Sequence, residues 1–487
     1  MKHILPILIT IALFAALVLC NFYYIPAYIP EAVSLLFALV LLLLNIRLIA
    51  KGRTKAPKII MTTVSVLAVC CGFAATYLSP YWNSIVYLQS PAQKVAYSEI
   101  LTSEQALQDI ATARKYLTKV HPAALGGLPQ NAAEMFDEIE QTVRAQESVT
   151  VSELQRALSA AVSCFQDGHT NVYSNFPEYR YLKCIYAHNE AGDRMAAVNG
   201  IPLRELYEQN KAYFSYDEEA EDYGYIAFRN IFTRPDGLAF LNIPIENGVV
   251  YTYEHPDGTT EDVVAYDEDF LVYAEYAAYN QIPDSTEETS FVSYEIDTAH
   301  DLAVLTLNKC ICNEEYRNVL HEMFTAVKEQ GITRVAVDLR ENGGGSSAVG
   351  TEFIRYLPVD RYWGWAAAHR MGCLNLKIKA MQVANKKHSD LTFDGEVYVL
   401  TSGITYSSAM DFAMYIKDNK LGQTVGEAPL NDPRGYGMVT QFRMPHSGLN
   451  LQISTAKWSR IDESNPTRFI EPDIPCDAEE ALEMLRR

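Results

Sequence analysis

The sequence predicts an α/β fold preceded by three membrane-crossing helices. From about residue 295 onward, apolar runs typical of buried strands alternate with helical segments, which is the pattern of an α/β core. Before residue 81, three apolar runs each approach the roughly 20 residues that a helix needs to cross a bilayer. A chain of 487 residues is also too long for one compact core, so we expect two to four units.

The three apolar runs are Ile4–Cys20, Ala32–Ala50 and Ile59–Leu78. A signal peptide is the alternative for the first run, but no small-residue cleavage site follows it. The strongly basic loop Lys51–Lys58 should stay in the cytoplasm. Three crossings then place everything after about residue 80 outside. We therefore expect a multi-pass protein of the cell membrane, anchored in the lipid bilayer by residues 1–80, with a linker over 81–104 and an extracellular catalytic domain.

Charge and cysteine content narrow the choice of partners. The chain has 40 basic and 60 acidic residues, a net charge of −20, which is poorly suited to binding nucleic acid. Of the 9 cysteines, those after residue 80 could form disulfides or remain buried thiols, and both alternatives stay open. No four-ligand zinc spacing, HExxH helix or Walker loop appears, so we expect no metal and no cofactor.

The part after the linker divides by pattern. Residues 105–170 show the 3.6-residue period of helices, and residues 171–290 alternate short strand-like pieces with turns. Residues 295–487 contain strand-like runs at 303–307, 335–339 and 396–400, with helical segments at 314–329 and 408–417.

Two of these strands end in groups suited to chemistry. Asp338–Ser346 contains three consecutive glycines, whose backbone amides can point into a cleft and stabilise an oxyanion or bind phosphate. A flexible strand-to-helix turn is the alternative. Thr401–Phe412 opens a helix, so helix amides lie near a serine hydroxyl at this point. Capping of the helix is the alternative for these serines.

A histidine supplies the third cluster. His169 lies in Gln166–Thr170, on a tight Asp-Gly turn that follows a helical run. Imidazole titrates near neutral pH and can remove the proton that makes a serine hydroxyl a poor nucleophile. Taken alone, this cluster favours an ordinary turn histidine.

Taken together, the three clusters resemble peptidase family S41, which includes the tail-specific (C-terminal processing) proteases and tricorn protease. Asp338–Gly345 matches the family's strand ending in Asp-Leu-Arg-x-Asn-x-Gly-Gly, and Thr405–Ala409 matches its serine element. Asp167–Thr170 is similar to the tricorn-like branch, which implies a serine–histidine rather than a serine–lysine mechanism. The resemblance covers roughly residues 105–487.

The resemblance implies a fold. A ClpP/crotonase-like core of repeated strand–strand–helix units is expected over 295–487. A helical subdomain over 105–170 and a PDZ-like substrate-binding subdomain over 171–290 would precede it, the latter containing Ala197–Pro202. The implied partner is a peptide or protein substrate, and the implied reaction needs no cofactor.

The resemblance also implies roles for particular residues. Ser407 would be the nucleophile and His169 its general base, with Ser408 as the alternative nucleophile if the register shifts by one. The oxyanion would be bound by the backbone amides of Ser408 and of Gly344 or Gly345. The candidates for the acid that orients His169 are Asp462, Glu463 and Glu471, of which Glu463 is favoured.

Two features depart from the family pattern. Met410 stands where family members often carry an acid, with Asp411 next, and Asn431–Gly437 lacks the lysine of the serine–lysine branch. The expected function is a membrane-anchored extracellular serine peptidase. An inactive homologue that binds peptides and a membrane-bound sensor are the alternatives. The sequence predicts neither the substrate nor the oligomeric state.

Overall fold

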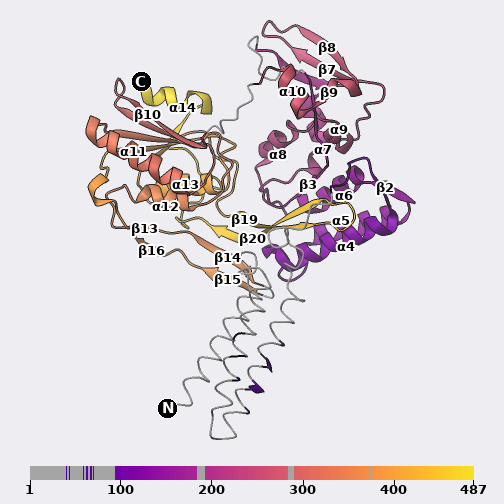
Figure 1. Cartoon of the computed structure of the whole chain (residues 1–487), viewed down its shortest axis with the longest axis horizontal. Helices are drawn as coiled ribbons and strands as arrows, with labels where there is room; N and C mark the ends of the chain where they lie inside the picture. Colours follow the sequence, from indigo (N-terminus) through magenta and orange to yellow (C-terminus); the bar gives the residue numbers. More distant parts are fainter. Residues whose placement is uncertain are drawn as a thin grey trace.

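The computed structural model describes residues 94–183, 192–282, 290–371 and 374–487, together with nine positions between 40 and 70. The continuous part is arranged as three units (Figure 1). We call residues 94–170 the helical unit, 180–282 the middle unit and 290–487 the sheet unit.

The helical unit is built on three helices and a short strand pair. Its elements are β1 (Ile100–Thr102), α4 (Ser103–Val120), α5 (Gln130–Arg144), β2 (Ser148–Thr150) and α6 (Val151–Ser163). Thr102 and Thr150 cap α4 and α6, and in each case a glutamine or glutamate three residues later completes a capping box. The apolar faces of the helices pack into one core with the strands β19 (Tyr436–Arg443) and β20 (Asn450–Ser459). In this core, the rings of Tyr116 and Phe442 stack with centroids 3.9 Å apart.

The middle unit combines a small antiparallel sheet with four short helices. Its sheet has the order β6-β5-β7-β8, and β4 pairs separately with β9. The elements are β4 (Arg180–Leu182), β5 (Arg194–Val198), β6 (Ile201–Pro202), α7 (Leu203–Asn210), α8 (Glu221–Phe228), α9 (Pro235–Phe240), β7 (Val249–Glu254), β8 (Thr260–Ala265), β9 (Phe270–Val272) and α10 (Tyr273–Tyr279).

The sheet unit contains a six-stranded sheet of order β10-β11-β12-β17-β18-β21. Only β10 is antiparallel to its neighbour; the other pairings are parallel. The strands are β10 (Val292–Asp297), β11 (Leu302–Leu307), β12 (Arg334–Asp338), β17 (Glu396–Thr401), β18 (Gln423–Gly426) and β21 (Ile474–Pro475).

Helices cover both faces of this sheet. One face is covered by three helices, α11 (Glu314–Gln330), α12 (Ala348–Ile354) and α13 (Ser408–Asp418). The other face is covered by α14 (Ala481–Arg486). The strands read as continuous apolar runs because both faces are buried: Val335 and Val337 belong to the first core and Ala336 to the second. The predicted strands at 303–307, 335–339 and 396–400 and the predicted helices at 314–329 and 408–417 are confirmed to within a residue or two.

A second sheet joins the units. Its order is β15-β14-β20-β19, with β3 also paired to β20. The strands are β3 (Asn171–Tyr173), β14 (Ala366–Met371), β15 (Leu374–Ile378), β19 (Tyr436–Arg443) and β20 (Asn450–Ser459), beside a separate pair of β13 (Arg361–Trp363) and β16 (Gln382–Ala384). The long hairpin β19–β20 extends from the sheet unit to the helical unit (Figure 1).

The α/β core was predicted correctly, but the membrane part of the predicted fold class is wrong. No helix among the residues that the structure describes is both long and apolar enough to cross a membrane. Even α4, with 18 residues, has a mixed surface that carries Glu104, Arg114 and Lys119. The same finding corrects the predicted multi-pass location and the predicted contact with a lipid bilayer. The runs Ile4–Cys20, Ala32–Ala50 and Ile59–Leu78 themselves lie almost entirely outside the described residues.

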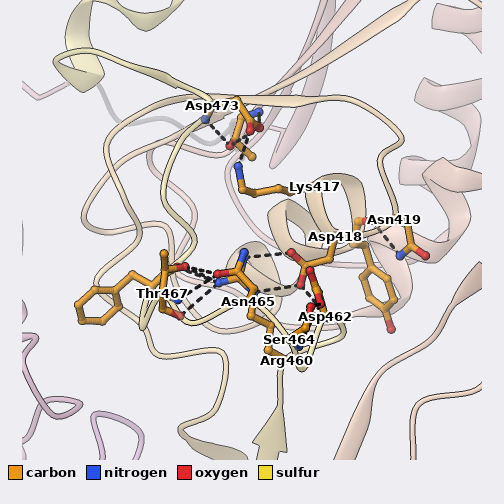
Figure 2. Close-up of polar contacts among 12 residues, drawn as sticks. Lys417, Asp418, Asn419, Arg460, Asp462, Ser464, Asn465, Thr467 and Asp473 are labelled. Atoms are coloured by element: carbon orange, nitrogen blue, oxygen red, sulfur yellow. Dashed lines mark hydrogen bonds and ion pairs between the residues drawn. The ribbon is translucent and has the colours of Figure 1, made fainter.

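A buried ion pair fixes the segment that follows β20. The Arg460 guanidinium donates to both carboxylate oxygens of Asp418, at 3.1 and 3.0 Å, and these side chains are 0% and 2% exposed. It also donates to the Thr467 hydroxyl at 2.8 Å and to the Phe469 carbonyl at 3.1 Å. Figure 2 shows Arg460 between Asp418 and Thr467. One guanidinium therefore connects the end of α13 to the loop of residues 460–469.

Replacing Arg460 by methionine should destabilise the protein strongly, because Asp418 would remain buried without its partner. We expect a loss of about 3–5 kcal/mol in the free energy of unfolding, measured by urea denaturation. The control is Arg194→Met: Arg194 is 72% exposed in its pair with Glu254, so the loss should stay below about 1 kcal/mol. Equal losses in the two variants would contradict this role of the buried pair.

Candidate active site

Ser407 lies on a strained turn between a strand and a helix. We call residues 402–407, between β17 and α13, the serine turn. Ser407 has φ 53° and ψ −123°, a region that residues other than glycine rarely adopt. The amide of Ser407 donates to Asn431 Oδ1 at 2.7 Å, and the Tyr406 amide donates to the Asn342 carbonyl at 2.9 Å. Such strain persists only where the surroundings hold it, and it places a serine at the amino end of α13.

The loop after β12 packs directly against this turn. We call residues 339–347 the glycine loop. Gly344 and Gly345 have φ 104° and 138°, and a Cβ on Gly344 would lie 2.6 Å from Cβ of Ser407. A Cβ on Gly345 would lie 2.4 Å from the carbonyl oxygen of Cys310. Only glycine fits at both positions, as the sequence pattern indicated.

The amides of the two loops differ in availability. The Gly344 amide donates to Asn342 Oδ1 at 2.8 Å, and Asn342 is itself fully buried and donates to the Leu307 carbonyl at 2.7 Å. Within the described part of the chain, the amides of Gly345 and Ser408 have no hydrogen-bond acceptor. The two amides that are free to donate to an oxygen of a bound molecule are therefore those of Gly345 and Ser408.

The Ser408 side chain is already occupied. It is buried and donates to the Gly345 carbonyl at 2.9 Å, with Ser347 Oγ 3.0 Å away. A hydroxyl engaged in this way is less suited to nucleophilic attack than the Ser407 hydroxyl. The geometry thus favours the predicted register with Ser407 over the alternative with Ser408.

The backbone of His169 is fixed by hydrogen bonds, whereas its ring nitrogens make none among the described residues. Its amide donates to Asp167 Oδ1 at 2.9 Å, and its carbonyl accepts from Gln452 of β20 at 2.8 Å. The ring is 12% exposed and lies over Tyr406, with centroids 4.8 Å apart. Neither ring nitrogen has a hydrogen-bond partner among the described residues.

Ser407 and His169 line the same cavity. The cavity has a volume of about 450 Å³, and its walls include Gly345, Ser408 and Asp411. The structure therefore brings together the predicted nucleophile, the predicted base and the two available amides. Gly344 contributes through its contact with Ser407.

The predicted acids are not at this cavity. Glu463 and Glu471 are exposed. Asp462 accepts from the amide and hydroxyl of Ser464, at 3.1 and 2.6 Å (Figure 2). Among the described residues, none of the three forms a hydrogen bond or ion pair with His169 or lines its cavity, so the favoured Glu463 does not lie beside it.

Asp167 is the carboxylate nearest the His169 ring, with 3.9 Å between its Oδ1 and Nδ1. It is fully buried, and burial, the largest influence, opposes its ionisation. The hydrogen bond from His121 Nε2, 3.0 Å away, and the charges of His121 and His169 nevertheless lower the pKa of Asp167 to about 2. His121 Nδ1 accepts from the Ala123 amide, so the proton of a neutral His121 lies on Nε2, toward Asp167.

Sequence reasoning missed further residues of this region. Asp411, Asp217 and Asn431 are all buried and surround the two catalytic candidates. Asp411 and Asn431 stand in stretches that the sequence pattern had singled out, but spacing alone gave them no role. Asp217 lies in an acidic stretch of the middle unit that carried no signal.

The α/β fold is similar to that of solved structures. The structural class agrees with mature CPAF, whose crystal structure matches with a TM-score of 0.55 and 14% sequence identity, covering 79% of this chain and 96% of that one. The structure of mature CPAF complexed with lactacystin matches with a TM-score of 0.54, again at 14% identity over 79% and 96% of the two chains. At this identity, the likeness establishes the shared fold.

Residues 301–476 match the model of peptidase family S41, which confirms the predicted resemblance. No curated protein sequence matches the chain. The matched range runs from β11 to the residue after β21 and includes the glycine loop and the serine turn, whereas His169 lies before it.

Replacing Asp411 by asparagine should stabilise the protein above pH 6. Burial raises the pKa of Asp411 from 3.8 to about 6, although the hydrogen bond from Ser347 and the charge of His169 oppose the rise. Ionising Asp411 therefore costs stability as the pH rises from about 4 to 6, and the full cost applies above pH 6. We expect a gain on the order of 1–3 kcal/mol in the free energy of unfolding at pH 7.5.

Urea denaturation at several pH values checks this, and the gain should vanish near pH 4. The control is Asp462→Asn: the hydrogen bond from Ser464 lowers the pKa of Asp462, so this variant should gain no stability at pH 7.5. A gain for Asp411→Asn that persists at pH 4 would show that its origin is not the buried charge.

Proposed function

We propose that the chain is a serine peptidase in which Ser407 is the nucleophile and His169 the general base. The observation that carries this proposal is the common cavity of Ser407, His169 and the amides of Gly345 and Ser408. A hydroxyl on a strained turn, an imidazole with unpartnered nitrogens and two vacant amide donors are the components that acyl transfer requires.

The reaction proceeds in two halves. Ser407 Oγ attacks the carbonyl carbon of the peptide bond while His169 takes the hydroxyl proton, and the carbonyl oxygen becomes an oxyanion. The oxyanion accepts from the amides of Gly345 and Ser408, helped by the amino end of α13. His169 then gives its proton to the leaving amine, and the acyl-enzyme on Ser407 is hydrolysed by a water that His169 deprotonates.

Two neighbours support these steps. Gly344 allows the glycine loop to approach Ser407, because any side chain there would meet Cβ of Ser407. Asp167 takes the place of Glu463 as the acid near His169. Its ionised carboxylate stabilises the imidazolium that forms when His169 accepts the serine proton.

The substrate is a peptide or protein segment, as the family resemblance implies. A second cavity has a volume of about 950 Å³. It lies between the middle unit, at β5 and α8, and two residues of the sheet unit, Glu341 of the glycine loop and Ile404 of the serine turn. The middle unit would act there as the PDZ-like, substrate-binding subdomain. It would hold a segment of chain whose scissile bond reaches Ser407.

Labelling of the full chain with a fluorophosphonate probe tests the proposal. The probe should modify Ser407, as mapped by mass spectrometry, and Ser407→Ala should abolish labelling. His169→Ala should lower the labelling rate by roughly 10²–10⁴-fold, because the hydroxyl loses its base. Ser408→Ala is the matched control and should leave the modification on Ser407.

The other outcomes are informative as well. Modification of Ser408 would keep the hydrolase and move the nucleophile by one residue. A folded protein that binds peptides but never reacts would instead be the inactive peptide-binding homologue. Since CPAF has been crystallised with lactacystin, slower labelling after treatment with lactacystin would support a similar cleft here.

A further inference from the structure

Asp217 is a buried carboxylate that the mechanism above does not use. It lies in the middle unit, just before α8, and is 2% exposed. Three N–H groups donate to it: the Gly168 amide at 2.9 Å, Asn431 Nδ2 at 2.7 Å and the Asp432 amide at 2.8 Å. These donors come from the helical unit and the sheet unit, so all three units of the fold meet at this side chain.

The same hydrogen bonds join the two candidate catalytic residues. Gly168 immediately precedes His169, and Asn431 Oδ1 accepts from the Ser407 amide at 2.7 Å. A continuous path therefore runs from the Ser407 amide through the side chains of Asn431 and Asp217 to the Gly168 amide. The path holds the backbone of Ser407 and of the residue before His169, and not the reactive atoms.

We propose that Asp217 is a positioning residue, which sets the separation of His169 and Ser407 through Asn431. The inference rests on the proposed function, since it assigns a role within that site. The middle unit then contributes to catalysis in addition to any role in holding substrate. Without Asp217, the serine turn and the turn that carries His169 lose the hydrogen-bonded link through Asn431.

The chemistry of the position requires a carboxylate. All three neighbours of Asp217 in hydrogen-bond range donate, and a carboxylate only accepts. An asparagine there would direct its own N–H₂ group at one of these donors. Burial, together with the nearby charge of Asp167, raises the pKa of Asp217, while His169 and the amide donors oppose the rise. A buried charge of this kind is tolerated because its hydrogen bonds are complete.

The surroundings leave little room for another arrangement. A Cβ on Gly168 would lie 2.0 Å from the Tyr406 hydroxyl, and one on Gly435 would lie 3.3 Å from Asp217 Oδ2. Tyr406 in turn stacks on Tyr223 of α8, with centroids 4.3 Å apart. Backbone and aromatic side chains thus pack closely around the turn that Asp217 holds.

A residue swap in the full chain tests the proposal. In Asp217→Asn, the new N–H₂ group faces one of the donors, either the Gly168 amide or Asn431 Nδ2. In Asn431→Asp, two carboxylates face each other. The double variant restores the bond with donor and acceptor exchanged. It keeps acceptors for the Gly168 and Ser407 amides and loses only the bond from the Asp432 amide. Asp193→Asn is the matched control, because Asp193 is also buried in the middle unit but bonds His255, at 2.8 Å.

Amide hydrogen exchange measured by mass spectrometry tests whether Asp217 holds the two turns, and it does not require the protein to be active. In Asp217→Asn, peptides covering 166–173 and 401–412 should exchange at least 10-fold faster, and the double variant should return most of this protection. Asp193→Asn should leave both peptides unchanged. Unchanged exchange in Asp217→Asn, or no recovery in the double variant, would overturn the proposal.

Fluorophosphonate kinetics read the consequence for catalysis. In Asp217→Asn, the maximal inactivation rate should fall about 10- to 100-fold, while the probe concentration at half-maximal rate stays within 2-fold, because only alignment is lost. The double variant should recover most of the rate, and Asp193→Asn should match the wild type. Equal losses in Asp217→Asn and Asp193→Asn would reduce Asp217 to a purely structural role. If the wild type does not label while the exchange pattern holds, the proposed function fails and the anchor stands.

Discussion

The contact between the glycine loop and the serine turn is the constraint on which the site depends. The two loops follow β12 and β17, which are parallel neighbours with Asp338 opposite Leu400, so both leave the sheet at the same edge. Gly344 then packs on Cβ of Ser407, closer than any side chain would permit. Because the two loops lie this close together, they form one wall of the cavity. This wall contains the Ser407 hydroxyl and the unbonded amides of Gly345 and Ser408.

His169 reaches this wall from a different unit, and the long strand β20 makes that possible. β20 pairs with β14 inside the sheet unit and with β3 directly after His169. It also donates to this turn, since the Ser454 amide of β20 donates to Thr170 Oγ1 at 3.0 Å. A single ten-residue strand thus fixes where the helical unit lies relative to the sheet unit. The separation of His169 and Ser407 is therefore a tertiary property of the whole fold.

The sequence predicted what depends on local pattern. Buried parallel strands are apolar throughout, and a glycine loop or a serine before a helix is visible in a few neighbouring residues. The acid beside His169 was not predictable from spacing, because the conformation of residues 460–469 depends on the buried guanidinium of Arg460, and that loop leaves Glu463 exposed. Asp217 is separated from Asn431 by more than two hundred residues, and an acidic stretch has no pattern that distinguishes its one buried member.

The charges of the buried acids near His169 depend on how many hydrogen bonds each carboxylate accepts. Asp167 accepts from His121, Thr170 and a backbone amide, and its pKa falls to about 2, so it stays ionised. The Asp411 carboxylate, with one serine donor, has a pKa of about 6 and gains its charge only as the pH approaches neutrality. The charge of His169 favours ionisation of both carboxyl groups. The negative charge near His169 is therefore largest above pH 6, where Asp411 has ionised beside the already ionised Asp167.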